Sequence, residues 1–432
     1  MNLYPKTPFR ISIKTLQNLE EVLMGELREI GATNIEAGKR VVHCTGDMGM
    51  VYRCNLHLRT ALRVLIPIVE FPIRQADDIH RQAMRFDWTE WLDLDQTFAI
   101  DPNVNSEFIK HSNYASVKLK DAIADTFNRK FDKRPSVHPD RPDVLFHLHV
   151  DNHRVTISLD SSGESLNRRG YRSRGARAPL NEVLAAGMIM LTGWRGESDF
   201  YDPMCGSGTL AIEANMIARK MPPQSLRNEF GFMRWNSFDK ALWQQVKREA
   251  MQEMVIPSHR IFASDADKFQ MRTAQENIEN AGFEDDIELK ELDFMELKPI
   301  SNEGIIVMNP PYGERMDEEN IIPMYKAIGD HLKHAYSGHS AWIISSDEDA
   351  LKRVGLKPSR KIALINGTLP CKFSASTCLP VSAMSATTRL QTHQTKPNEQ
   401  HHIDHRSYLR VWQSHCGAIC RRALESYTHG PP

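Results

Sequence analysis

The chain has 432 residues, of which 41% are hydrophobic and 25% charged, so it is too long for one ordinary domain and has the composition of a globular protein. Its formal net charge of -1 gives no support to nucleic-acid binding, so any such contact must depend on local basic patches. No apolar run predicts a membrane span, and seven dispersed cysteines favour a reduced, cytoplasmic setting over a disulfide framework.

The first zone, residues 9–160, mixes strand and helix signals. Apolar residues between Leu16 and Ile30 recur at helical spacing, and a second helix is expected at residues 116–131. Strands are expected at residues 40–46, 62–71, 96–102, 144–150 and 154–160. This pattern predicts an α+β region.

The second zone, residues 178–373, alternates strands with helices. Strands are expected at residues 198–203, 260–265, 287–293, 304–312 and 341–346, and helices at 208–220, 268–282, 322–338 and 347–355. The alternation predicts a doubly wound, mostly parallel α/β sheet. Asn366-Gly367 then predicts a closing antiparallel hairpin, which is typical of class I methyltransferases and unusual for nicotinamide-binding domains.

The third zone, residues 374–432, is polar and is expected to be disordered or peripheral. Its histidines and cysteines lack a paired metal-ligand spacing, so no metal is expected.

A glycine-rich turn joins the strand ending at Asp202 to the helix that follows. Glycines allow a ligand to approach the backbone, and the helix N-terminus attracts an anion such as a carboxylate or phosphate. Asp202 could bind an ammonium group. The alternative is a tight turn without a ligand. The candidate binding residues are Asp202, Cys205, Gly206, Ser207, Gly208 and Thr209.

The same turn also fits G-x-G-x-x-A, the dinucleotide fingerprint. That fingerprint requires a ribose-binding acid about 20 residues later, at the end of a strand, and residues 219–232 offer no such strand. A P-loop is excluded because no G-x-x-x-x-G-K-[ST] occurs.

Two further acids follow expected strands. Asp265 could bind ribose hydroxyls, and Asp293 could accept from an adenine amine with Phe294 beside the ring, because ligands lie outside the carboxyl ends of parallel strands. The alternative is that these acids are helix caps or loop residues. Asp267 is the more natural cap, since it directly precedes a helix.

The motif Asn309-Pro310-Pro311-Tyr312 decides between these possibilities. The Asn309 side chain and the Pro310 carbonyl could hold an exocyclic base amine and direct its lone pair at a methyl group. Consecutive prolines would stiffen the loop, and Tyr312 could stack on an extruded base. The alternative is a rigid turn in an unrelated fold.

A basic stretch links the first two zones. Its arginines and tyrosine could pair with phosphates and stack on RNA bases, although a solvated linker is the alternative. The candidate RNA-binding residues are Arg168, Arg169, Tyr171, Arg172, Arg174 and Arg177. A smaller basic cluster at residues 129–134 could grip phosphates or be an exposed helix end.

Together these motifs resemble the THUMP-containing class I RNA methyltransferases, and among them the L type of ribosomal large-subunit guanine-N2 methyltransferases. The segments that carry the resemblance include SLNRRGYR, YDPMCGSGTLAIEA, MNPPYGERM and INGTLPCKF. The resemblance stops after Phe373. It implies a ferredoxin-like region (residues 1–70), a THUMP domain (71–165), a methyltransferase domain (166–373) and a tail (374–432).

The resemblance also implies a function. S-adenosylmethionine is the expected donor, and 23S ribosomal RNA or a large-subunit precursor is the expected partner, with guanine N2 as the acceptor. Adenine N6 in RNA or DNA remains open, because the same motif serves both amines. A non-catalytic RNA-binding assembly factor is disfavoured by the intact motifs, and a nicotinamide oxidoreductase is disfavoured by the missing ribose acid.

Overall fold

A computed structural model describes residues 8–173, 179–312 and 318–378. The predictions for Arg174, Arg177 and residues 379–432 therefore fall outside the described residues. None of the helices in the described ranges is long and apolar enough to span a membrane.

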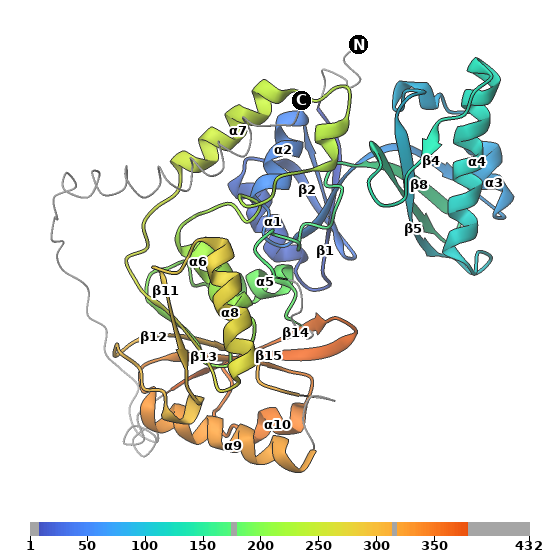
Figure 1. Ribbon diagram of the computed structural model, residues 1–432. Coiled ribbons are helices and arrows are strands. Elements are labelled where there is room, and N and C mark those ends of the chain that lie inside the picture. Colours follow the sequence, from blue (N-terminus) through green and yellow to red (C-terminus); the bar gives the residue numbers. More distant parts are fainter. Residues whose placement is uncertain (1–7, 174–178, 313–317, 379–432) are drawn as a thin grey trace. The chain divides into compact units, whose positions relative to one another are not determined.

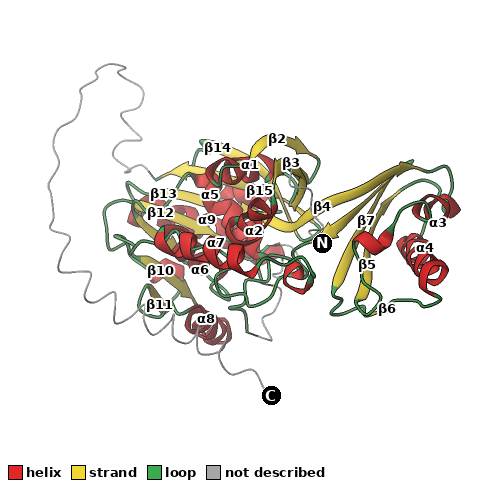
Figure 2. Cartoon of the chain, turned by 90° about the horizontal axis from the view of Figure 1, so that it is seen from above, coloured by secondary structure: helices red, strands yellow, loops and turns green. Residues whose placement is uncertain are grey.

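The N-terminal half forms one eight-stranded sheet with the order β2-β3-β1-β4-β8-β7-β5-β6 (Figures 1 and 2). Helices α1 and α2 lie against its first strands, and α4 packs on β5. The α+β prediction is confirmed. The elements are β1 (Phe9–Thr15), α1 (Glu20–Glu29), β2 (Thr33–Gly38), β3 (Val41–Gly46), α2 (Met48–His57), β4 (Ala61–Pro72), α3 (Asp77–Ala83), η1 (Trp88–Glu90), β5 (Thr97–Asn105), α4 (Ser112–Phe131), β6 (Ser136–Val137), β7 (Val144–Asp151) and β8 (Arg154–Asp160).

The long strand β4 makes this sheet continuous. Its first half pairs with β1, with Ser12 opposite Leu65, and its second half pairs with β8, ending at Pro72 opposite Arg154. Two smaller sheets are thereby joined edge to edge through one shared strand.

The second half of the chain contains a seven-stranded sheet with the order β11-β10-β9-β12-β13-β15-β14. Its first five strands are parallel, and β15 pairs antiparallel with both β13 and β14. The predicted doubly wound sheet with a closing hairpin is confirmed. The elements are α5 (Glu182–Thr192), β9 (Asp199–Asp202), α6 (Thr209–Ala218), η2 (Gly231–Arg234), α7 (Lys240–Gln252), β10 (Ile261–Asp265), α8 (Lys268–Ala281), β11 (Ile287–Glu291), η3 (Phe294–Glu296), β12 (Gly304–Met308), α9 (Glu318–Ala335), β13 (Ser340–Ser345), α10 (Glu348–Arg353), β14 (Arg360–Asn366) and β15 (Leu369–Thr377).

Alternate residues of each strand face opposite layers of helices. On β12, Ile305 and Val307 join the core under α5, α6 and α8, whereas Ile306 and Met308 join the core under α9. Burial on both faces explains why β12 is a continuous apolar run in the sequence. Because β9, β10 and β12 pair in parallel, their carboxyl ends lie at one edge of the sheet.

The hairpin extends further than the sequence suggested. Ser374 was expected to begin the polar tail, but β15 continues to Thr377, which pairs with Ser340 of β13. Small polar residues conceal this part of the strand, because the pairing uses backbone groups and needs no apolar signal.

Candidate active site

A cavity of about 680 Å³ opens at the carboxyl ends of the parallel strands. It brings together three motifs that are far apart in the chain: the glycine-rich turn after β9, the acids after β10 and β11, and the loop after β12. The predicted residues in its wall are Cys205, Gly206, Ser207, Thr209, Asp265, Asp293, Phe294, Asn309 and Pro311.

The glycine-rich turn has a conformation that requires its glycines. Gly206 and Gly208 have φ angles of +53° and +79°, in the left-handed region that residues other than glycine rarely adopt. The Gly206 N–H donates to Asp265 Oδ2 at 2.9 Å, and Asn277 Nδ2 donates to the Ser207 carbonyl at 2.8 Å. Helix α6 then begins at Thr209, and Thr209 and Leu210 of its first turn line the cavity.

Asp202 lies behind this turn and does not itself line the cavity. Its side chain is completely buried, and neither carboxylate oxygen accepts a hydrogen bond of ordinary geometry from the described part of the chain. Burial, and then the negative charge of Asp265, raise the pKa of Asp202 well above its usual value. A contact with the Ala211 N–H of α6 opposes this rise without reversing it. A buried carboxyl with no stronger partner is suited to receive a cationic group of a ligand.

The two other acids accept hydrogen bonds from backbone N–H groups beside the cavity. Asp265 accepts the N–H groups of Gly206 and Asp267, and Asp293 accepts the Met295 N–H at the start of η3. Asp293 is therefore a cap that also lines the cavity, and its predicted contact with an adenine amine stays a prediction. Asp267 caps α8, as predicted. Phe294 forms an apolar wall, with its ring edge-on to His331.

The loop after β12 places an unused acceptor in the cavity. Asn309 Oδ1 is buried and has no hydrogen-bond partner among the described residues. Pro310 is buried, and the Pro311 carbonyl accepts a 3.4 Å hydrogen bond from the Tyr325 hydroxyl. This contact and the two proline rings hold the loop beside the glycine-rich turn.

Three family models match successive parts of this chain. The model described as "RMKL-like, methyltransferase domain" matches residues 169–375. The models described as "THUMP domain" and "RlmL ferredoxin-like domain" match residues 74–160 and 10–65. A protein of Synechocystis sp., which its name assigns to the RNA methyltransferases, is 33% identical over 82% of this chain and 93% of its own length. The chain belongs to the THUMP-containing, RMKL-like family of S-adenosylmethionine-dependent RNA methyltransferases.

Two further relatives extend the comparison. A protein of Desulfotalea psychrophila named ribosomal RNA large subunit methyltransferase K/L is 35% identical over 82% of this chain. The chain spans about half (51%) of that relative's length. The crystal structure of SMU.472, a complex with S-adenosylhomocysteine, has a TM-score of 0.79 and 27% identity over 87% of this chain and 100% of its own.

The donor of this family, S-adenosylmethionine, fits the residues present. The buried carboxyl of Asp202 suits an ammonium group, and the first turn of α6 suits a carboxylate. The acids after β10 and β11 lie where a nucleoside would reach them, at the carboxyl ends of the strands.

Tyr312 does not have the position expected of it. Its ring is buried away from the cavity, and its hydroxyl accepts from Asn366 Nδ2 at 2.7 Å. The prediction that it offers a stacking face is therefore wrong for this conformation, because the hairpin β14–β15 holds the ring in the core.

The prediction of RNA binding is also wrong for two residues of the basic stretch. Arg169 and Tyr171 are buried, and both bond to Glu213 of α6, Arg169 through its Nε at 3.2 Å and Tyr171 through its hydroxyl at 3.3 Å. Neither side chain is available to RNA. Arg168 is mostly exposed and pairs with Glu164, whereas Arg172 turns inward to the glycine-rich turn.

Several residues that line the cavity lie outside the motifs found in the sequence. Pro179 and Leu180 line the cavity just before α5, and Met324 and Ala327 line it from α9. The last two lie on the helix that follows the Asn-Pro-Pro-Tyr loop, and that proximity is the only signal the sequence offers for them.

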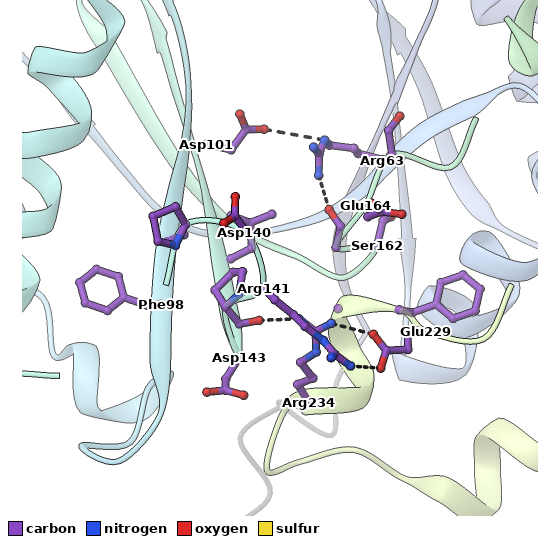
Figure 3. Close-up of a pocket in the computed structure, with 18 of the residues that line it drawn as sticks. Arg63, Phe98, Asp101, Asp140, Arg141, Asp143, Ser162, Glu164, Glu229 and Arg234 are labelled. Carbon is purple, nitrogen blue, oxygen red and sulfur yellow. Dashed lines mark hydrogen bonds and ion pairs between the residues drawn. The ribbon is translucent and has the colours of Figure 1, made fainter. Parts of the chain in front are cut away.

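A larger hollow of about 990 Å³ lies elsewhere, between strands β5, β6 and β7 of the eight-stranded sheet and residues 226–234 (Figure 3). Its lining is strongly charged, but its arginines are engaged by neighbouring acceptors. Arg63 pairs with Asp101 and Asp160, and Glu229 bridges Arg141 and Arg234. With its charges paired in this way and without a glycine-rich turn, this hollow does not suit the donor.

Proposed function

We propose that this chain transfers a methyl group from S-adenosylmethionine to the exocyclic N2 amine of a guanine in 23S ribosomal RNA, and that it does so in the cytoplasm. The observation that carries the proposal is the buried, unpartnered Asn309 Oδ1 in the same cavity as the glycine-rich turn. An acceptor without a partner in a buried position is unfavourable unless a donor arrives to satisfy it.

The chemistry requires that acceptor. The donor supplies an electrophilic methyl group on a sulfonium. The lone pair of an exocyclic base amine is delocalised into the ring, so the amine is a poor nucleophile. Accepting its two N–H groups at Asn309 Oδ1 and the Pro310 carbonyl would hold the lone pair toward the methyl group and stabilise the positive charge that develops on nitrogen.

RNA is the proposed substrate because the catalytic domain follows RNA-binding architecture in the same chain. A THUMP domain matches residues 74–160, and relatives carry the name of ribosomal RNA methyltransferases. We propose residues 1–70, 71–165 and 166–373 as the ferredoxin-like, THUMP and catalytic regions. Within the described residues, Arg168 is the member of the predicted basic stretch that remains open to RNA.

The test is the identity of the methylated nucleoside. Purified protein and tritiated S-adenosylmethionine are incubated separately with unmodified ribosomal RNA, transfer RNA and duplex DNA, and each product is digested and separated. The proposal predicts label in N2-methylguanosine from large-subunit ribosomal RNA. Label in N6-methyladenosine would establish the alternative amine, and label only in DNA, or no label, would contradict the proposal.

A further inference from the structure

The basic segment that begins at Arg168, between β8 and α5, contains a side chain that points away from solvent. Arg172 donates from Nε to Glu182 at 2.7 Å and from Nη2 to the Leu180 carbonyl at 3.1 Å. Its remaining N–H groups reach the hydroxyls of Ser207 at 3.4 Å and Thr209 at 3.3 Å. One guanidinium therefore contacts both the start of α5 with the residues before it and the glycine-rich turn after β9.

Three of these partners belong to residues that line the donor cavity. Leu180 comes from the segment before α5, and Ser207 and Thr209 come from the glycine-rich turn. Their hydroxyls also lie 3.3 Å from each other. Arg172 thus ties two walls of the cavity together from behind.

The segment that carries Arg172 is itself held in place. The Ser173 N–H donates to Asn277 Oδ1 at 2.7 Å, and Nδ2 of the same asparagine donates to the Ser207 carbonyl. Asn280 Nδ2 donates to the Tyr171 carbonyl at 3.1 Å. Helix α8 therefore links this segment to the glycine-rich turn by a second route.

Glu182 fixes the orientation of the guanidinium. It lies in the first turn of α5, is nearly completely buried, and accepts from both Arg172 and Asn167. A buried carboxylate paired with a partly buried arginine gives charge-assisted hydrogen bonds, which are shorter and stronger than neutral ones. The hydroxyls of Ser207 and Thr209 thus meet donors whose positions are set in advance.

We propose that Arg172 is a positioning residue for the donor-binding turn, so that it sets affinity for S-adenosylmethionine and does not contact RNA. The inference rests on the proposed use of the cavity for the donor. A planar fork is needed because four acceptors in different directions must be met at once, which a lysine ammonium on a flexible stem does poorly.

The test is the dissociation constant for S-adenosylhomocysteine, measured by calorimetry on the full chain. Arg172→Lys should weaken binding about tenfold, the loss expected for one or two charge-assisted hydrogen bonds. Arg168→Lys is the matched control. It lies in the same segment but pairs on the surface with Glu164, and it should leave the dissociation constant unchanged.

A second variant covers the case in which Arg172→Lys does not fold. Glu182→Gln keeps the shape of the buried side chain but removes the charge that orients the guanidinium, and it should weaken binding in the same direction by a smaller factor. Folding of each variant is checked by its thermal transition without ligand. If every folded variant binds as tightly as the wild type, the proposal is overturned.

Steady-state kinetics separate positioning from RNA contact. In Arg172→Lys the KM for the donor should rise with the dissociation constant, and the KM for RNA should stay constant. A rise confined to the KM for RNA would overturn the proposal in favour of an RNA contact. A wild type that does not bind S-adenosylhomocysteine would instead refute the donor site itself, so the two failures are distinguishable.

Discussion

Asp202→Asn should separate the stability of the ligand-free protein from its affinity for the donor. Asp202 is fully buried, and its pKa is raised by burial and by the nearby charge of Asp265. The substitution preserves the shape of the side chain and removes its ability to ionise. It should therefore weaken donor binding and remove a pH-dependent penalty on folding.

The binding effect follows from the loss of a buried charge partner. An ammonium group that reaches this position would no longer meet a carboxylate, and breaking a buried pair costs about 3 kcal/mol or more, which is a factor of about one hundred in the dissociation constant. Calorimetry with S-adenosylhomocysteine measures this factor. Because binding needs ionised Asp202, wild-type affinity should also rise with pH up to the raised pKa, and the variant should lose that dependence.

The stability effect has the opposite sign. The folded pKa of Asp202 is raised, so the folded protein keeps a proton that the unfolded chain releases above the usual value of 3.8. Stability should therefore fall as the pH rises from that value toward the folded pKa, by about 1.4 kcal/mol for each unit by which the pKa is raised. Ligand-free Asp202→Asn should become the more stable protein at the high end of that range.

Thermal transitions of both proteins across this range check the sign. Asp347→Asn is the control, because Asp347 caps α10 by accepting two backbone N–H groups, and asparagine caps equally well. The reasoning is refuted if Asp202→Asn binds S-adenosylhomocysteine as tightly as the wild type, or if the two proteins lose stability in parallel as the pH rises.

Two further predictions concern packing. Arg169→Gln leaves Glu213 buried without its charge partner and should destabilise the chain by about 3–5 kcal/mol in chemical denaturation. A loss below about 1 kcal/mol, the range expected of a surface pair, would contradict this account. Gly329→Ala would place its Cβ 1.8 Å from the Val354 carbonyl oxygen, so α9 and α10 must separate, at a cost of about 3 kcal/mol. Gly25→Ala in α1 is its control, since nothing lies within 4 Å, and equal transitions for both variants would refute the argument.

The sequence predicts the catalytic sheet well because its signals are local. The central strands β12 and β13 are apolar runs bounded by turns, and Asn366-Gly367 marks the hairpin at which the sheet reverses direction. Helix α5 is absent from the predicted elements because it has no such local signal. It is buried on nearly all sides, from Val183 to Ile189, so no polar face gives it a period.

The motifs also predict which residues meet, but not which way they point. Parallel strands bring Gly206, Asp265 and Asn309 to one edge whatever the side chains do, and the cavity contains all three. The burial of Arg169 depends instead on Glu213, an acid that only the folded chain brings near. A run of arginines has the same appearance in the sequence whether it faces solvent or an internal carboxylate.

Helix α7 shows a related limit. Trp243 and Val246 pack in the core of the N-terminal region with Tyr52, although in the sequence they come between β9 and β10 of the catalytic sheet. This long-range contact has no counterpart in local pattern.

In the proposed reaction Asn309 acts on the base amine and not on the donor. The most direct measurement is the single-turnover rate of methyl transfer by Asn309→Ala at saturating S-adenosylmethionine, alongside its dissociation constant for S-adenosylhomocysteine. We expect an unchanged dissociation constant and a rate about one hundred to one thousand times lower, because the variant loses a preorganised group that stabilises transition-state charge. A rate within about twofold of the wild type would contradict it.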